Sequence, residues 1–289
     1  MLNINRIEFN CPCDKDFRIL HASDSHLIFA DNRDDERKLA LAARRVEPFD
    51  KPEILLNNLN ETIKYANENC DLFLYSGDLI DFVSKKNLET MKDVLSQVKI
   101  PMLFAAGNHE YSLYVGEAKE DDNYRAQSFN LVQKCVPNNL ECSSLEFNGI
   151  NFVSFDNSYY YFREEHLIFW EEQLAKALPM VLLLHNPLHS DSLFEMSQKC
   201  RNRIVAYLCG SHEEKLVDYP PKRIEQQKPN ALTLEFIKLV KSSSLVKAIF
   251  AGHIHFPSIT YFTDKIPQLV TGGNFQGDVN EIFVKSKSK

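Results

Sequence analysis

The chain has 289 residues, of which 44% are hydrophobic and 25% are charged. This composition is typical of a globular protein and excludes a disordered chain, a collagen-like repeat and a small secreted scaffold. The formal net charge of −7 argues against binding of long nucleic acid, because proteins with that function usually carry a basic face. We therefore expect a small or locally charged substrate and regard nucleic acid as an unlikely partner.

The cysteines predict a reducing compartment. There are seven of them, an odd number that fits no disulfide framework. Cys11 and Cys13 lack the two-residue spacer of a redox motif and have no second Cys/His pair nearby, so we interpret them as ordinary residues. No apolar run approaches the ~20 residues of a membrane span, and the first residues do not resemble a secretion signal. These features together predict a cytoplasmic protein with no membrane partner.

Short apolar runs alternate with amphipathic stretches along the chain, which predicts an α/β fold with a mostly parallel sheet. Buried strands are predicted over residues 17–22, 72–76, 102–106, 180–184 and 247–251. Strands of more antiparallel character are predicted over 151–155, 258–263, 268–271 and 281–285. Helices are predicted over 53–69, 87–98, 163–178 and 230–241, where apolar residues recur at helical spacing.

Three long segments interrupt this alternation. Residues 27–52 are charged, 111–136 are polar and aromatic, and 186–229 contain several prolines. Insertions of this length in a compact α/β domain are usually functional loops or lids, and each one begins directly after a candidate site residue. We therefore predict one domain over residues 1–289, with three loops around one pocket. The charged run 31–38 is interpreted as the solvated start of a helix.

Each of the five buried strands is followed by a short polar block. The blocks are Asp24-Ser25-His26, Gly77-Asp78-Leu79-Ile80-Asp81, Gly107-Asn108-His109-Glu110, His185-Asn186-Pro187 and Gly252-His253-Ile254-His255. Ligands of parallel α/β sheets bind outside the carboxyl ends of the strands, so these blocks can converge. The glycines that precede Asp78, Asn108 and His253 would permit tight turns that expose those side chains.

If the blocks converge, they provide a set of oxygen and imidazole ligands: Asp24, His26, Asp78, Asn108, His185, His253 and His255. Such a mixed set suits Mn, Fe or Zn better than Ca or a thiolate metal site. Seven ligands are too many for one tetrahedral ion but suit two ions that share a carboxylate. A shared carboxylate holds two cations ~3.5–4 Å apart, the separation found in two-metal phosphoester hydrolases.

In these blocks the sequence resembles the calcineurin-like metallophosphoesterase family. The family pattern is D-x-H, GDxxD, GNH(E/D), a lone His and GHxH, and all five blocks stand in this order between Asp24 and His255. The resemblance implies a four-layer α/β sandwich, in which two mixed β-sheets are flanked by helices, with a dinuclear metal site at one edge. The cofactors would be two divalent or mixed-valence ions of Mn, Fe or Zn.

The resemblance also implies the division of ligands between the two ions. One ion would take Asp24, His26, Asp78 and His255, and the other would take Asp78, Asn108, His185 and His253, so that Asp78 bridges. A metal-bridging hydroxide would then attack phosphorus in line. His109 would stabilise the phosphoryl oxygens or protonate the leaving group, and Asp81 would orient His109.

Residues next to the blocks narrow the branch of the family. Protein Ser/Thr phosphatases have arginines where this chain has Phe82 and Ala106, and purple acid phosphatases have a tyrosine at the position of Asp81. What remains is similar to the compact phosphodiesterase branch, so a phosphodiesterase acting on a small phosphoester is favoured. The alternatives are a phosphomonoesterase or nucleotidase of the same family, a nuclease, and a non-catalytic scaffold of the same fold.

The remaining polar and aromatic residues are interpreted as structural. His21, His166, His189 and His212 stay outside the site, and His189 is the nearest of them to a substrate-contacting interpretation. The run 159–162 could form a stacking wall for a nucleobase, but packing between sheet and helix is favoured. Glu110 either braces the site or lies on the surface. No feature of the sequence predicts an oligomeric state.

Overall fold

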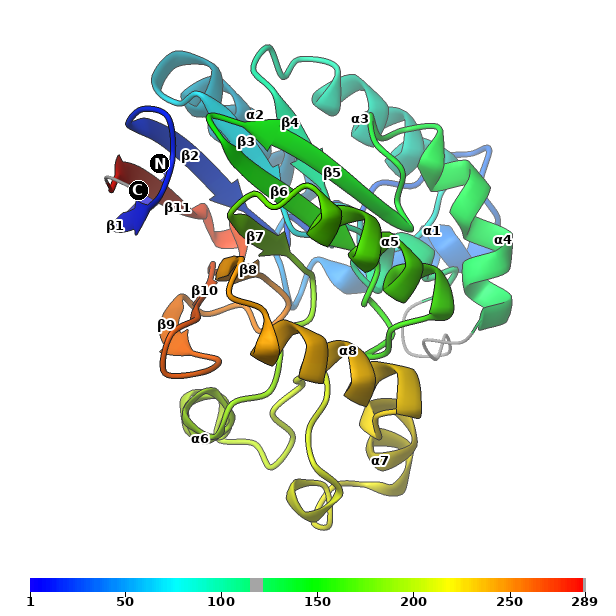
Figure 1. The fold of residues 1–289 in the computed structure, drawn as a ribbon. Coiled ribbons are helices and arrows are strands. Elements are labelled where there is room, and N and C mark those ends of the chain that lie inside the picture. Colours follow the sequence, from blue (N-terminus) through cyan, green and yellow to red (C-terminus); the bar gives the residue numbers. More distant parts are fainter. Residues whose placement is uncertain (115–121, 288–289) are drawn as a thin grey trace.

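The computed structural model describes residues 1–114 and 122–287. Two β-sheets pack face to face, and helices cover the outer face of each sheet (Figure 1). A central core between the sheets includes Ile19 and Leu74 from one sheet and Phe152, Leu183 and Phe250 from the other. This arrangement confirms the predicted four-layer α/β sandwich with two mixed β-sheets.

The first sheet has five strands in the order β1 (Asn3–Cys11), β11 (Asp278–Ser286), β2 (Phe17–Ala22), β3 (Leu72–Tyr75) and β4 (Met102–Phe104). Strands β2, β3 and β4 are parallel to one another, whereas β11 is antiparallel to β2 and parallel to β1. Strand β1 is absent from the predicted elements. Its inward residues Phe9 and Cys11 alternate with exposed polar residues, as in a half-buried strand.

The second sheet has six strands in the order β5 (Cys142–Phe147), β6 (Ile150–Phe155), β7 (Met180–Leu183), β8 (Val246–Ala251), β10 (Pro267–Val270) and β9 (Ser258–Tyr261). Its four central strands are parallel, and the two edge strands are antiparallel to their neighbours. Strand β5 was also not predicted. It forms a hairpin with β6 through Asn148 and Gly149, whose φ angles are 48° and 76°.

The helices divide between the two outer faces. Those that pack on the first sheet are α1 (Glu36–Arg45), α2 (Pro52–Asn69), α3 (Lys85–Leu95) and α4 (Asp122–Gln133). The second sheet is covered by α5 (Glu164–Ala175) and α8 (Ala231–Ser242), and α6 (Asp191–Arg201) and α7 (Pro221–Gln227) belong to a smaller cluster beside it. None of the helices in the described part of the chain has the length and apolarity needed to cross a membrane.

The three segments predicted as loops contain helices. Segment 27–52 holds α1, segment 111–136 holds α4, and segment 186–229 holds α6 and α7, while residues 115–121 of the second segment lie outside the described residues. The predicted helix start in the charged run is confirmed, because the Asp35 carboxylate caps α1 and accepts the Lys38 N–H at 2.9 Å. Helix α1 has a single buried residue, Leu41, so its apolar stripe is too narrow to be recognised from spacing.

Candidate metal centre

The five polar blocks meet at the carboxyl ends of β2, β3, β4, β7 and β8, as the parallel topology requires. All seven predicted metal ligands lie there and form two neighbouring groups with short contacts between their donor atoms. Asp24 and His185 are completely buried, and His26 and Asp78 are each 1% exposed. The sequence prediction therefore identified side chains that the fold brings together.

The first group consists of Asp24, His26 and His255. His255 Nε2 lies 3.2 Å from Asp24 Oδ1 and 3.0 Å from His26 Nε2. Asp24 Oδ1 is buried and faces these two imidazoles, but it accepts no hydrogen bond from the described residues. A buried carboxylate oxygen without a hydrogen bond costs free energy, and a cation held between it and the two imidazole nitrogens would satisfy it. These three residues fit a metal ion.

The second group consists of Asp78, Asn108, His185 and His253. His185 Nε2 lies 3.2 Å from both Asp78 Oδ2 and Asn108 Oδ1, and 3.0 Å from His253 Nδ1. The same Asp78 Oδ2 lies 3.8 Å from His26 Nε2 in the first group. One carboxylate oxygen therefore faces both groups, and the set as a whole fits two cations that share it.

An unusual backbone supports these side chains. Five of the seven candidate ligands have φ angles in the left-handed region: Asp24 at 59°, His26 at 47°, Asp78 at 54°, His253 at 68° and His255 at 56°. Such angles are uncommon for residues other than glycine and cluster at functional sites, where the surrounding structure maintains them.

The glycines of the blocks allow a close approach of two turns. Gly77 has a φ of 90°, and a Cβ atom at this position would lie 2.4 Å from the backbone nitrogen of Gly107. A Cβ atom at Gly107 would in turn lie 2.2 Å from Asp78 Oδ1. The two glycines therefore let the turns after β3 and β4 meet around the Asp78 carboxylate.

Glu110 braces this pair of turns. Its carboxylate is completely buried and accepts N–H groups from Gly107 and Asp78 at 2.7 Å and from Leu79 at 2.8 Å. Burial and the nearby charge of Asp78 raise the pKa of Glu110 to about 7. Of the two interpretations left open by the sequence, the structure supports the bracing one.

Asp81 connects a predicted ligand with the predicted proton donor. Its Oδ1 lies 3.0 Å from His26 Nδ1 and 3.2 Å from His109 Nδ1, and its backbone carbonyl lies 2.7 Å from the same His109 nitrogen. Contacts to Nδ1 leave Nε2 of each ring for a metal or a substrate. Burial alone would lower the pKa of His109, but the carboxylates of Asp78 and Asp81 raise it to about 10.

His109 also belongs to a third candidate group. A ring nitrogen of His109, a ring nitrogen of His26 and a carboxylate oxygen of Asp78 lie close enough to hold an ion together. The His109 backbone N–H donates to Asp78 Oδ1 at 2.8 Å, which fixes the residue directly beside the bridging carboxylate. The geometry is thus compatible both with a proton donor and with an additional ligand, and the two roles differ in whether metal binding requires the imidazole.

Segment 27–52 adds two residues to the site that the sequence did not predict there. Arg45, at the end of α1, donates to Asp81 from Nε at 2.7 Å and from Nη2 at 2.9 Å. Phe49 stacks on His26 with ring centres 4.2 Å apart, and the Arg45 guanidinium lies 4.7 Å from the Phe49 ring centre. This segment therefore forms one wall of the site.

The aromatic run 159–162 is largely ordinary packing, as favoured from the sequence, because Tyr159, Tyr160 and Phe162 are buried. Tyr160 has a further role, since its hydroxyl lies 2.6 Å from His253 Nε2 and so fixes the ring whose Nδ1 faces His185. The pattern offered no signal for this contact, because nothing local distinguishes Tyr160 from its neighbours.

The four histidines kept outside the site have other partners. His21 Nε2 contacts Ser76 Oγ at 2.8 Å in the core, and His166 Nε2 contacts Glu141 at 2.9 Å. His189 lies beside Ser211 and Phe194, and its ring is 5.9 Å from that of His212. These contacts are structural ones, which agrees with the interpretation from the sequence.

Comparisons with known proteins agree with the fold. The structure is similar to a dimetal phosphatase from Danio rerio, with a TM-score of 0.54 and 14% sequence identity, over 91% of this chain and 89% of that chain. It is also similar to a purple acid phosphatase from yellow lupin (Lupinus luteus), with a TM-score of 0.52 and 15% identity, over 93% of this chain and 45% of that chain. At such low identity these similarities establish the fold alone.

The sequence itself carries the assignment to a family. None of the curated proteins compared with it gives a match. The family model described as calcineurin-like phosphoesterase matches residues 17–257, a range that contains all five polar blocks and most of the chain. The protein therefore belongs to the calcineurin-like phosphoesterase family.

Proposed function

We propose that the protein is a dinuclear metal-dependent phosphodiesterase that hydrolyses a small phosphoester. Asp24, His26, Asp78 and His255 would hold one ion, and Asp78, Asn108, His185 and His253 would hold the other. The observation that carries this proposal is the position of Asp78 Oδ2, which lies 3.2 Å from His185 Nε2 and 3.8 Å from His26 Nε2. A carboxylate between two groups of imidazoles is the arrangement expected of a bridging ligand.

The protein side chains have distinct tasks in this proposal. When bound, two ions of Mn, Fe or Zn would lower the pKa of a water molecule toward ~7 and so supply the nucleophile. Asp81 keeps Nδ1 of His26 and of His109 occupied, so that Nε2 of His26 faces the ligand cluster. His109, whose side chain is 17% exposed, would donate a proton to the leaving oxygen or a hydrogen bond to the phosphoryl group.

The charge distribution favours a diester over a monoester. A phosphomonoester dianion is usually recognised by arginines that remain available to its oxygens. Among the described residues, the arginine whose contacts reach this site is Arg45, and it directs two donors at the Asp81 carboxylate, so much of its charge is already compensated. A diester carries a single negative charge and needs fewer such donors.

The cytoplasmic location predicted from the cysteines remains a prediction.

Metal analysis combined with turnover tests this function. The purified protein is stripped with a chelator, reloaded with Mn²⁺ and analysed for metal content. Turnover is then compared between bis(p-nitrophenyl) phosphate and p-nitrophenyl phosphate. We expect two ions per chain, loss of turnover on chelation and a higher kcat/KM for the diester.

Each other outcome selects an alternative. A higher kcat/KM for the monoester would favour a phosphomonoesterase or nucleotidase, and cleavage of a labelled oligonucleotide in preference to both would favour a nuclease. Two bound ions without any turnover would favour a scaffold. Fewer than two ions per chain would contradict the dinuclear site itself.

A further inference from the structure

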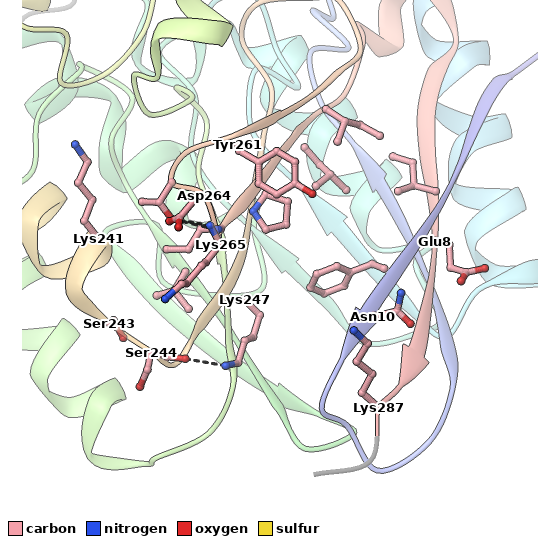
Figure 2. Close-up of a pocket in the computed structure, with 18 residues that line it drawn as sticks. Glu8, Asn10, Lys241, Ser243, Ser244, Lys247, Tyr261, Asp264, Lys265 and Lys287 are labelled. Atoms are coloured by element: carbon pink, nitrogen blue, oxygen red, sulfur yellow. Dashed lines mark hydrogen bonds between the residues drawn. The ribbon is translucent and has the colours of Figure 1, made fainter.

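A cleft of about 820 Å³ lies between the edges of the two sheets (Figure 2). Residues 7–10 of β1 line one side, and Ile259 and Tyr261 of β9 line the other. The cleft also reaches the first residues of β8 and β10, whereas the metal centre lies at the carboxyl end of β8. It is therefore a feature of the opposite end of the sheets and not part of the site described above.

The floor of the cleft is formed by residues of the central core. Phe9 and Leu269, which line it, belong to the core between the two sheets, and Ile7 packs against that core. On the rim, Ile259 and Tyr261 are 52% and 58% exposed. Large apolar side chains that point outward from an edge strand are unusual, because edge strands are normally protected by charges or covered. The cleft thus combines an apolar floor with an apolar rim.

Both strands beside the cleft are unpaired on one side. Within the described residues, β1 pairs only with β11, and β9 pairs only with β10. Each strand therefore has a row of backbone N–H and C=O groups that another strand could pair with. An extended peptide is the ligand that matches such a row, because its own backbone supplies the complementary donors and acceptors.

The charges around the cleft are mostly positive. Four lysines line it, Lys241, Lys247, Lys265 and Lys287, together with the acidic residues Glu8 and Asp264. Figure 2 shows Lys247 and Lys265 on one wall and Lys287 on the other. Glu8 is already paired with Lys285, at 2.6 Å. In a chain with a net charge of −7, this local excess of lysine is complementary to an acidic ligand.

We propose that this cleft binds an extended acidic segment of a partner protein. The backbone of the segment pairs with the free edge of β9 or β1. Its apolar side chains contact the floor around Phe9 and Leu269, and its carboxylates contact Lys247, Lys265 and Lys287. The proposal concerns a surface separate from the metal centre and holds whichever phosphoester the enzyme hydrolyses.

The test uses a fluorescein-labelled peptide of about ten residues in which glutamate alternates with valine, long enough to span about 33 Å when extended. Fluorescence anisotropy should show saturable binding that weakens as salt is raised. A peptide with lysine in place of glutamate should not bind. The glutamate peptide with every second amide N-methylated should bind at least about tenfold more weakly, because methylation blocks strand pairing but keeps the side chains.

Charge reversal locates the binding surface. Combining Lys247→Glu, Lys265→Glu and Lys287→Glu should weaken binding at least about tenfold. The matched control reverses three exposed lysines in or next to the helices on the outer face of the first sheet, Lys64→Glu, Lys92→Glu and Lys134→Glu, and should bind as the unmodified protein does. Circular dichroism and unfolding temperature verify that both variants fold. If the triple variant does not fold, Lys265→Glu alone and the N-methylated peptide still decide the question.

Several results would overturn the proposal. These are absence of peptide binding, equal binding of the N-methylated peptide, and equal effects of the two sets of reversals. Binding of inorganic phosphate, or of a fatty-acid anion such as laurate, without binding of the peptide would show that the cleft is a site for small anions instead.

Discussion

Compared with the amino ends of the strands, the carboxyl ends hold their charges almost entirely out of solvent. Asp81 is completely buried and contacts His26, His109 and Arg45, so its charge is compensated within the site. Around the cleft at the other end, Lys265 and Lys287 are exposed and have no acidic partner among the described residues. Buried, mutually compensated charges fix geometry for chemistry, whereas exposed uncompensated charges attract a partner.

The largest effect is expected for Asp78→Asn at the carboxyl ends. The neutral amide cannot offset the charge of two cations, so the variant should lose most bound metal and on the order of 10³-fold or more in turnover. Metal analysis and the rate of diester hydrolysis check this. A variant that keeps two ions and a near-normal rate would show that Asp78 is not the bridge.

His109→Ala separates proton donation from metal binding. Both ions should stay bound, and kcat should fall by ~10²–10⁴-fold for substrates with poor leaving groups. The loss should shrink for nitrophenolate, which needs no proton to depart. Loss of metal would instead make His109 a ligand, in line with its place beside His26 and Asp78.

Asp81→Asn should be a milder version of the same change. The backbone carbonyl of Asp81, 2.7 Å from His109 Nδ1, remains in the variant and continues to hold the imidazole. Leaving-group dependence measured in parallel for both variants compares the two. An effect of Asp81→Asn larger than that of His109→Ala would assign Asp81 a role beyond orientation.

Arg45→Met removes the compensating charge without touching a predicted ligand. Asp81 would lose two donors, so we expect a ~10–100-fold loss in Mn²⁺ affinity or turnover, as for other partners of metal ligands. Leaving a buried charged acceptor unsatisfied should also cost about 1–3 kcal/mol of unfolding free energy. Isothermal titration with Mn²⁺ and denaturant unfolding measure the two effects.

A matched arginine provides the control for Arg45. Arg33 lies in the same segment and pairs with the carboxylates of Asp31 and Glu89, whereas Arg45, among the described residues, pairs with Asp81 alone, and the Arg33 side chain is 43% exposed. Arg33→Met should leave metal affinity unchanged, and Arg45→Lys should recover part of the loss. Equal effects of the Arg33 and Arg45 substitutions would mean that Arg45 acts only on general stability.

The smallest effects are expected at the amino ends. Lys265→Met and Lys287→Met should each change the free energy of unfolding by less than about 0.5 kcal/mol, because these ammonium groups are exposed and lack acidic partners among the described residues. Denaturant unfolding checks this. A cost comparable with that of Arg45→Met would remove the contrast between the two ends.

The sequence predicts best those features that depend on residues close together in the chain. The candidate ligands could be named because each lies in a short block after a buried strand, and parallel strands bring such blocks to one edge. Arg45 and Phe49 could not be named, since α1 carries little apolar pattern and its position against Asp81 is a tertiary contact. The left-handed backbone of Asp24 and His255 is likewise imposed by the surrounding fold.

The cleft and the missed strands show the same limit. Strand β1 is recognised only through its pairing with β11, which lies at the other end of the chain. The cleft then arises between residues near both ends of the sequence, 7–10 and 259–269. In segment 186–229, Leu216 and Tyr219 are buried in the small cluster around α6, although their surroundings in the sequence are polar and rich in proline.

Anomalous scattering from a crystal soaked with Mn²⁺ and phosphate would locate the metal ions of the proposed dinuclear site. We expect two peaks per chain, ~3.5–4 Å apart, with the Asp78 carboxylate between them, His26 and His255 on one peak and His185 and His253 on the other. A single peak, or peaks that do not share Asp78, would contradict the dinuclear site at the carboxyl ends of the strands.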